Sequence, residues 1–272
     1  MLHPVLAIVA GGLIGLSLGA LGGGGSILAV PVLVYVLGQS PAQATTGSLV
    51  VVGVTALIGA VAAHRAGNVL FGRGVVFGVV AVGGAVAGAL GAAHVSEPVL
   101  LAAFAVLMLL VGVLMTVRQL RPGAAQPHAS SALGDPIITF SPSFACACPR
   151  ALKVLVTATV VGLLTGFLGV GGGFLIVPAL VLALALPMQY AVGTSLVVIV
   201  TTSAAALLVR VGSVVQPDWW LVLVLTGASA VGGYAGVRVA DRTDTRRLSR
   251  AFTALVLTVA AYTAARALPA LI

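Results

Sequence analysis

Two glycine-rich stretches interrupt long apolar runs of the sequence. The first is Gly22 to Gly25, followed by Ser26, and the second is Gly169 to Gly173, interrupted by Val170. Glycine adopts backbone angles that other residues resist, so each stretch predicts a break in a helix. The helix that begins after such a break exposes amides with partial positive charge, which can bind an anion without a charged side chain. The alternative is that these glycines only let helices pack closely.

Hydroxyl side chains follow both glycine stretches. Thr45-Thr-Gly-Ser48 follows the first and Gly193-Thr-Ser195 follows the second, with Gln43 and Tyr190 at matched positions beside them. These side chains can donate hydrogen bonds to an oxyanion, or they can cap the helix and bond back to its carbonyls. The sequence therefore predicts a substrate-binding set comprising Gly24, Gly25, Ser26, Gln43, Ser48, Gly171, Gly172, Gly173, Tyr190, Thr194 and Ser195.

Two arginines stand at matched places after these elements. Arg65 and Arg210 each close an apolar run. They are predicted to gate the two mouths of a path or to attract anions to it. The alternative is that their side chains only reach the membrane interface.

Clusters that would hold a metal or relay protons are not predicted. All five acidic residues are expected in loops, so a carboxylate relay or a carboxylate-based sodium site is not expected: Glu97, Asp135, Asp218, Asp241 and Asp244. Cys146 and Cys148 are spaced poorly for a disulfide and are expected to be reduced thiols, with a role in handling reactive sulfur as the alternative. No cofactor is predicted, and no enzyme chemistry.

The composition identifies the setting of these residues. Of 272 residues, 60% are hydrophobic and 7% are charged, whereas soluble domains carry about 25% charged residues. Mean hydropathy is +1.23. The chain is therefore predicted to be a polytopic protein of the cell membrane. The net charge of +8 is spread between apolar runs and forms no single patch, so it indicates orientation in a bilayer rather than nucleic-acid binding.

Uncharged runs and turn signals divide the chain into about ten apolar segments. A helix needs about 20 apolar residues to cross a bilayer, so the runs of 64 and 56 uncharged residues must turn within the membrane or at its edge. The predicted fold class is all-α, with about 8–10 membrane segments. They cover roughly 5–20, 26–38, 44–63, 74–94 and 98–117, then 153–167, 174–186, 191–208, 219–238 and 250–267. Segments 26–38 and 174–186 are too short to cross alone.

The two halves repeat each other. Gly15–Pro31 aligns with Gly162–Pro178 at an offset of 147, which also places Ser48 on Ser195. Arg65 then matches Arg210 at an offset of 145, and the same offset pairs Gly88 and Gly91 with Gly233 and Gly236. The predicted organisation is a first repeat at 1–121, a cytoplasmic linker at 122–150 and a second repeat at 151–272.

The basic residues predict that the repeats have inverted topology. With the linker inside, 11 of the 13 basic residues lie on the cytoplasmic side, and only Arg210 and Arg266 lie outside. The corresponding connection then lies on opposite sides in the two halves, and both termini are extracytoplasmic. Inverted repeats with broken helices are typical of secondary transporters that bind substrate near the midplane.

The doubled motif resembles the TauE/SafE permeases. Gly15–Pro31 with Thr45–Ser48, and Gly162–Pro178 with Gly193–Ser195, carry the resemblance. It implies a transporter, by expectation an exporter, of sulfite, organosulfonates or related sulfur anions. Uptake of such anions, and transport of an unrelated small carboxylate, are the alternatives within transport. An intramembrane enzyme and a packing subunit are the alternatives outside it. The expected partners are a small anion and the lipid bilayer, and the sequence predicts no oligomeric state.

Overall fold

The structure, a computed structural model, describes residues 2–92, 97–120, 148–168, 173–210 and 218–271. Every regular element within these ranges is a helix, which confirms the all-α prediction. The first half holds α1 (Leu2–Leu21), α2 (Gly24–Pro31), the π-helix η1 (Val32–Val36), α3 (Pro41–Arg65), α4 (Phe71–Ala92) and α5 (Glu97–Leu120). The second half holds α7 (Cys148–Leu168), α8 (Gly173–Leu182), α9 (Met188–Arg210), α10 (Trp219–Arg242) and α11 (Thr245–Leu271). Most of the predicted linker, residues 121–147, lies outside the described residues.

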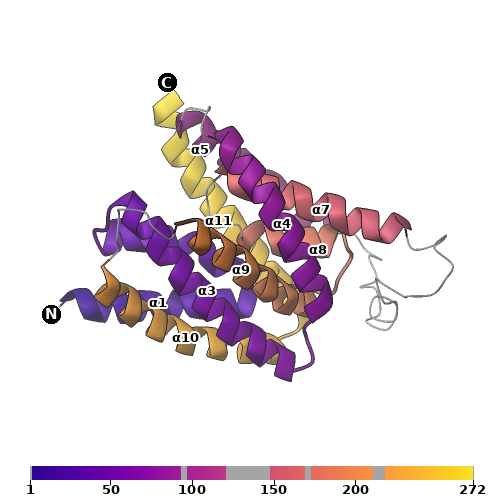
Figure 1. Cartoon of the computed structure of the whole chain (residues 1–272), viewed down its shortest axis with the longest axis horizontal. Helices are drawn as coiled ribbons and strands as arrows, with labels where there is room; N and C mark the ends of the chain where they lie inside the picture. Colours follow the sequence, from indigo (N-terminus) through magenta and orange to yellow (C-terminus); the bar gives the residue numbers. More distant parts are fainter. Residues whose placement is uncertain (1, 93–96, 121–147, 169–172, 211–217, 272) are drawn as a thin grey trace.

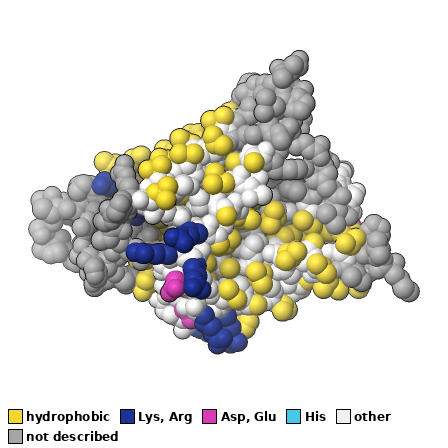
Figure 2. Space-filling view, turned by 180° about the vertical axis from the view of Figure 1, so that it is seen from behind, with side chains coloured by type: hydrophobic (Ala, Val, Ile, Leu, Met, Phe, Trp, Pro, Cys, Tyr) yellow, Lys and Arg dark blue, Asp and Glu magenta, His cyan; other side chains and the backbone are white. Residues whose placement is uncertain are grey.

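Four helices of the described chain are long and apolar enough to cross a membrane: α3, α4, α9 and α10. Shorter apolar segments lie in α1, α2, α5, α7 and α8. Many large apolar side chains point outward, among them Val231 at 73% exposure and Leu90 at 68%. Figure 2 shows hydrophobic side chains over much of one face of the molecule. Such a surface suits lipid rather than water, in agreement with a polytopic membrane protein.

The two halves are intertwined. The first long helix of each half packs along the third long helix of the other, so α1 lies on α10 and α7 lies on α4. Figure 1 shows both pairs side by side. In addition α3 packs on α9, α5 on α11, and the short α2 on the short α8. This reciprocal pairing gives the two halves matching places in the fold. Their inversion relative to the membrane stays a prediction.

Glycines let the paired helices touch backbone to backbone. A Cβ on Gly232 would stand 2.4 Å from the nearest atom of α1, the Gly12 carbonyl oxygen, and one on Gly84 would stand 2.5 Å from the Thr159 carbonyl oxygen on α7. Gly12 and Thr159 differ by the sequence offset of 147, whereas Gly84 and Gly232 differ by 148. The predicted pairing of Gly88 with Gly233 was therefore wrong. Gly88 matches Gly236 instead, since both meet the carbonyl of a residue one turn further along the partner helix.

The short helices α2 and α8 carry proline where the repeats predicted it. Pro31 is the last residue of α2, and Pro178 lies inside α8. Proline removes a helical hydrogen bond and crowds the preceding turn. After Pro31 the helix widens into η1, where the Leu37 amide donates to the Val32 carbonyl at 3.0 Å. The irregular turn of the first half thus begins directly after its proline, whereas α8 continues for four residues beyond Pro178.

The expectation that all acidic residues lie in loops was wrong for two of them. Asp241 lies in the last turn of α10, and Glu97 is the first residue of α5. Asp218 is outside the helix but caps α10, because its side chain accepts from the amides of Trp220 and Leu221. These carboxylates stand at helix ends, where their charge can still reach water. Asp135 is outside the described residues.

Candidate functional site

Gly23 of the first glycine stretch meets Gly173, the last residue of the second stretch, in the buried interior. A Cβ added to Gly23 would overlap the Gly173 carbonyl, and one added to Gly173 would stand 3.2 Å from the Gly23 Cα. Gly22 has a φ of +70°, a conformation that favours glycine. Residues Gly22 to Ser26 are all buried, as is Gly173. The first half therefore presents its break directly to the second half. Gly171 and Gly172 lie outside the described residues.

Two serines line this meeting point. Ser26 lies beside Gly173, with its Oγ 2.7 Å from the position of a Cβ there, and it donates to the Gly23 carbonyl at 2.6 Å. Ser195 lies against Gly22 and donates to the Val192 carbonyl at 2.7 Å. Each hydroxyl proton is thus used within its own helix, while the oxygen lone pairs remain. Either hydroxyl must rotate before it can donate to an anion.

Thr194 and Ser48 have different surroundings. The Thr194 Oγ1 accepts from the Leu70 amide at 3.2 Å and thereby fixes the connection between α3 and α4. Its own proton remains for another acceptor. The Ser48 hydroxyl donates to the Thr45 carbonyl at 2.9 Å. Ser48, Thr194 and Ser195 are all buried. The hydroxyls of Ser48 and Ser195 therefore bond back to carbonyls of their own helices, as serines in helices commonly do. Of these three residues, only Ser195 directly adjoins a described glycine break.

The remaining predicted residues of the first half serve local structure. A Cβ on Gly25 would stand 2.5 Å from the Ile14 carbonyl oxygen, so Gly25 packs against α1. A Cβ on Gly24 would meet the Leu255 side chain of α11. Gln43 completes a capping box with Ser40 at the start of α3. In contrast, no side chain of the described residues caps α2. The start of α2 is therefore an uncapped helix end directly beside the glycine contact.

A small cavity lies on one side of this contact. Its volume is about 10 Å³, which is room for about one water molecule. Gly19 and Val192 line it, and the Val192 Cα stands 3.3 Å from the Cβ position of Gly22. Asn68, Gln189 and Asp241 line it as well, and the Asn68 Nδ2 donates to Asp241 Oδ1 at 2.9 Å. The cavity thus has both polar residues and neighbours of the glycine contact in its lining.

The comparisons with known proteins agree with this arrangement. The profile of the family described as "Sulfite exporter TauE/SafE" matches residues 7–263. The chain belongs to the TauE/SafE family. It is 34% identical over 261 residues to a "Probable membrane transporter protein" of Xylella fastidiosa strain 9a5c, covering 95% of this chain and 94% of that protein. A protein of the same name from strain Temecula1 is 33% identical over 264 residues, with the same coverage. No solved structure matches the chain significantly.

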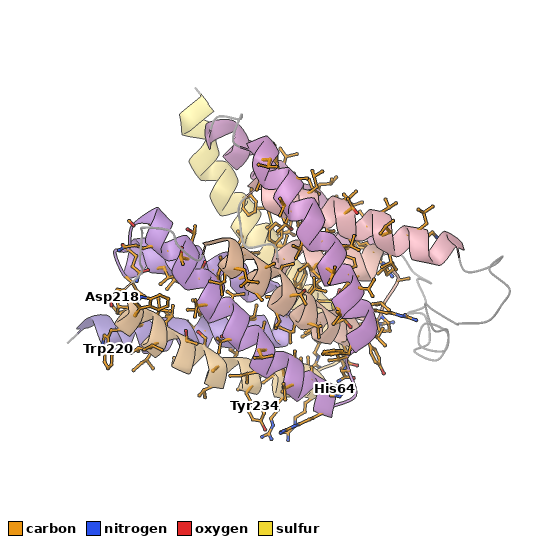
Figure 3. All side chains as sticks on the ribbon, viewed as in Figure 1. His64, Asp218, Trp220 and Tyr234 are labelled. Carbon is orange, nitrogen blue, oxygen red and sulfur yellow. The ribbon has the colours of Figure 1, made fainter. Side chains whose placement is uncertain are left out.

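Family and relatives together indicate a membrane transporter rather than an enzyme. In this TauE/SafE protein the predicted gating arginines are not at the glycine contact. Arg65 is exposed at the end of α3, and Arg210 is the last residue of α9, with its side chain outside the described set. Figure 3 places His64, next to Arg65, at the lower edge of the view, and Asp218 and Trp220 well away from it at the left.

Sequence reasoning missed three polar residues of this TauE/SafE protein. Asn68 and Gln189 lie outside the doubled motif. Asn68 reaches the cavity from the connection between α3 and α4, and Gln189 from the first turn of α9. Gln39 precedes the α3 capping box and reads as part of a turn signal. Its side chain is nevertheless buried. A lone amide in a Gly/Ser/Pro stretch gives no sign of burial, so no signal in the sequence could have found Gln39.

Proposed function

We propose that the protein moves small sulfur oxyanions across the cell membrane, as an exporter, and that it binds the anion where the two glycine breaks meet. The observation that carries the proposal is the contact of Gly22 and Gly23 in the first half with Gly173 and Ser195 in the second. A ligand held there touches both halves. Relative movement of the halves would therefore expose it to either side, as alternating access requires.

The chemistry of the contact suits an anion. The start of α2 has no side-chain cap, and Ser26 and Ser195 add oxygens that can turn to donate. A desolvated anion needs several donors, and hydrogen bonds to a charged group are about twice as strong as neutral ones. The contact is closed in this conformation, because a single added Cβ at Gly23 would overlap the other half. We infer that the halves separate when the anion enters. We also propose that the linker faces the cytoplasm and both termini face outward.

Flux into proteoliposomes tests this function. The purified protein should transport sulfite, or one of thiosulfate, taurine and sulfoacetate, faster than acetate. Acetate tests the alternative of a carboxylate substrate, and preloaded vesicles test both directions. Transport of acetate alone would contradict the proposal, and the absence of any anion flux would contradict it more broadly.

Ser195→Ala tests the site within the same assay. Loss of one hydrogen bond to a charged ligand should weaken anion binding by about 1–2 kcal/mol. Ser229→Ala is the matched control, because Ser229 is equally buried and donates to the Leu225 carbonyl at 2.6 Å, but lies on the α1–α10 interface. Equal binding by the parent and both variants would place the anion elsewhere.

A further inference from the structure

Gln39 has a buried side chain with unpaired polar atoms. It is 7% exposed, and neither Oε1 nor Nε2 has a hydrogen-bond partner among the described residues. Its backbone is fixed, since its amide donates to the Leu33 carbonyl at 3.0 Å. The Oε1 stands 3.6 Å from the position of a Cβ on Gly47, where the side chains of Val222 and Leu33 also end. The carboxamide therefore points into the space that the missing side chain of Gly47 leaves open.

The second half shows that the fold does not need an amide here. Leu186 occupies the place of Gln39 at the offset of 147, and its amide donates in the same way to the Leu180 carbonyl at 3.1 Å. Leu186 is buried as well. At the place of Gly47 the second half has Thr194, whose hydroxyl is paired with the Leu70 amide. This backbone hydrogen bond is the same in both halves, but among the described residues only the first half buries an unpaired side-chain amide.

A buried amide without hydrogen-bond partners destabilises the folded protein, so a functional reason for keeping it is a ligand that pairs with it. The carboxamide of Gln39 offers two N–H donors and one carbonyl acceptor. An anion with acceptors alone would satisfy Nε2 and leave Oε1 unpaired. An oxyanion that also carries a hydroxyl group satisfies both. Such an anion can accept from Nε2 through S–O⁻ and donate to Oε1 through S–O–H.

We propose that Gln39 is a second anion-binding residue and that it favours oxyanions bearing a hydroxyl, such as hydrogensulfite, over sulfonates. The proposal rests on the proposed function. Gly47, which faces the carboxamide, directly precedes Ser48 on α3, and Val222 lies in the first turn of α10. Gln39 therefore lies at the end of the molecule marked by Asp218 and Trp220 in Figure 3, away from Asn68 and Asp241. An anion that moves between the glycine contact and that end can bind to it.

The experiment compares hydrogensulfite with methanesulfonate in proteoliposomes at mildly acidic pH. The two anions share the S–O acceptors, and only hydrogensulfite has a form with a hydroxyl. Gln39→Met keeps the length of the side chain and removes both polar atoms. It should lower the ratio of hydrogensulfite flux to methanesulfonate flux about tenfold. Gln39→Leu installs the residue of the other half and should give the same ratio, and it carries the test if Gln39→Met does not fold.

Thr55→Val is the control, because the Thr55 Oγ1 is also buried and unpaired within the described chain but packs against Gly233 of α10. Both Gln39→Met and Thr55→Val should raise the melting temperature, and only the former should change the ratio. An unchanged ratio in a folded Gln39 variant, or an equal loss of both fluxes, overturns the proposal. If the parent protein carries neither anion but does carry thiosulfate, taurine or sulfoacetate, the proposal for Gln39 is overturned while the proposed function stands. If it carries no sulfur anion at all, the proposed function itself has failed.

Discussion

At the scale of single residues, the clearest difference between the halves lies in the turn before α3 and α9. Gly38 has a φ of +67°, and Ala185, at the offset of 147, has a φ of +51°. A left-handed conformation costs a residue with a Cβ roughly 1–2 kcal/mol relative to glycine. The second half therefore keeps a strained alanine where the first half uses glycine.

We predict that Ala185→Gly stabilises the protein and that Gly38→Ala destabilises it. Each substitution should change the free energy of unfolding by about 1 kcal/mol. A glycine also gives the unfolded chain more conformational freedom, which offsets part of both effects. Melting temperatures in one detergent, measured by intrinsic fluorescence, give the sign of both. Gly72→Ala, at an exposed position with nothing within 4 Å, serves as the control. A lower melting temperature for Ala185→Gly would show that the backbone of Ala185 is not strained.

The sequence predicts which residues could form the site, but not how they are partnered. The first glycine stretch breaks a helix where expected, because Gly22 adopts a backbone conformation that favours glycine; of the second stretch only Gly173 is among the described residues. The serine hydroxyls bond to carbonyls three residues back, which no spacing rule distinguishes from bonding to a ligand. Asn68 reaches Asp241 across 173 positions of the chain, and only the packed fold brings them together.

At the scale of helices, close packing rather than capping holds the halves together. Two adjacent glycines on α4 show which positions need glycine for packing and which do not. A Cβ on Gly84 would stand 2.5 Å from the Thr159 carbonyl oxygen of α7, whereas a Cβ on Gly83 would meet nothing within 4 Å. Without a hydrophobic driving force in lipid, such small-residue contacts carry much of the helix association.

We predict that Gly84→Leu disrupts the fold and that Gly83→Leu is tolerated. The leucine at 84 meets backbone, which cannot turn aside as a side chain can. Size-exclusion profiles and melting temperatures of both variants in detergent report the result. Helix propensity and hydropathy change equally in the two, so a similar loss in both would show that packing against α7 is not the cause.

Helix positions were largely predictable, whereas their register was not. Charge-free runs and glycine turns indicated α3 to α5 and α9 to α11 within a few residues of their ends. The sequence offset of 145 near Gly88 failed because glycine and alanine recur too often to fix an alignment. The contacts of these glycines with α1 and α7 give an offset of 148, because each carbonyl of the partner helix meets one particular glycine.

At the scale of the whole molecule, charge is gathered at one end. The connection between α3 and α4 meets the end of α10 through the bond from Asn68 to Asp241. Exposed arginines lie there at the end of α10 and the start of α11: Arg238, Arg242, Arg246, Arg247 and Arg250. Figure 2 shows a group of basic side chains, in dark blue, on one face of the molecule. Gln119 at the end of α5 bonds to Ser249 and Thr253 of α11, so α5 also ends near these arginines. These helix ends share one side although they come from both halves.

The arginines at the α10–α11 junction predict the orientation of the protein in the membrane. Cytoplasmic connections carry an excess of basic residues, so the arginine end should face the cytoplasm and the start of α10 should face outward. Single cysteines in a background lacking Cys146 and Cys148 test this. Trp220→Cys, at a position 71% exposed, should react with a membrane-impermeant maleimide in intact cells. Ala66→Cys, exposed between α3 and α4, should react only after the membrane is opened.

The inverted topology needs one further pair of labels, because a single orientation does not distinguish it from a parallel repeat. The turns that hold Gly38 and Ala185 occupy matched places in the two halves. Ser40→Cys and Ala185→Cys, both at exposed positions, should therefore react from opposite sides, the former from outside. Labelling of both from the same side would rule out inversion, and with it the proposal that movement of one half against the other opens the site alternately to the two faces.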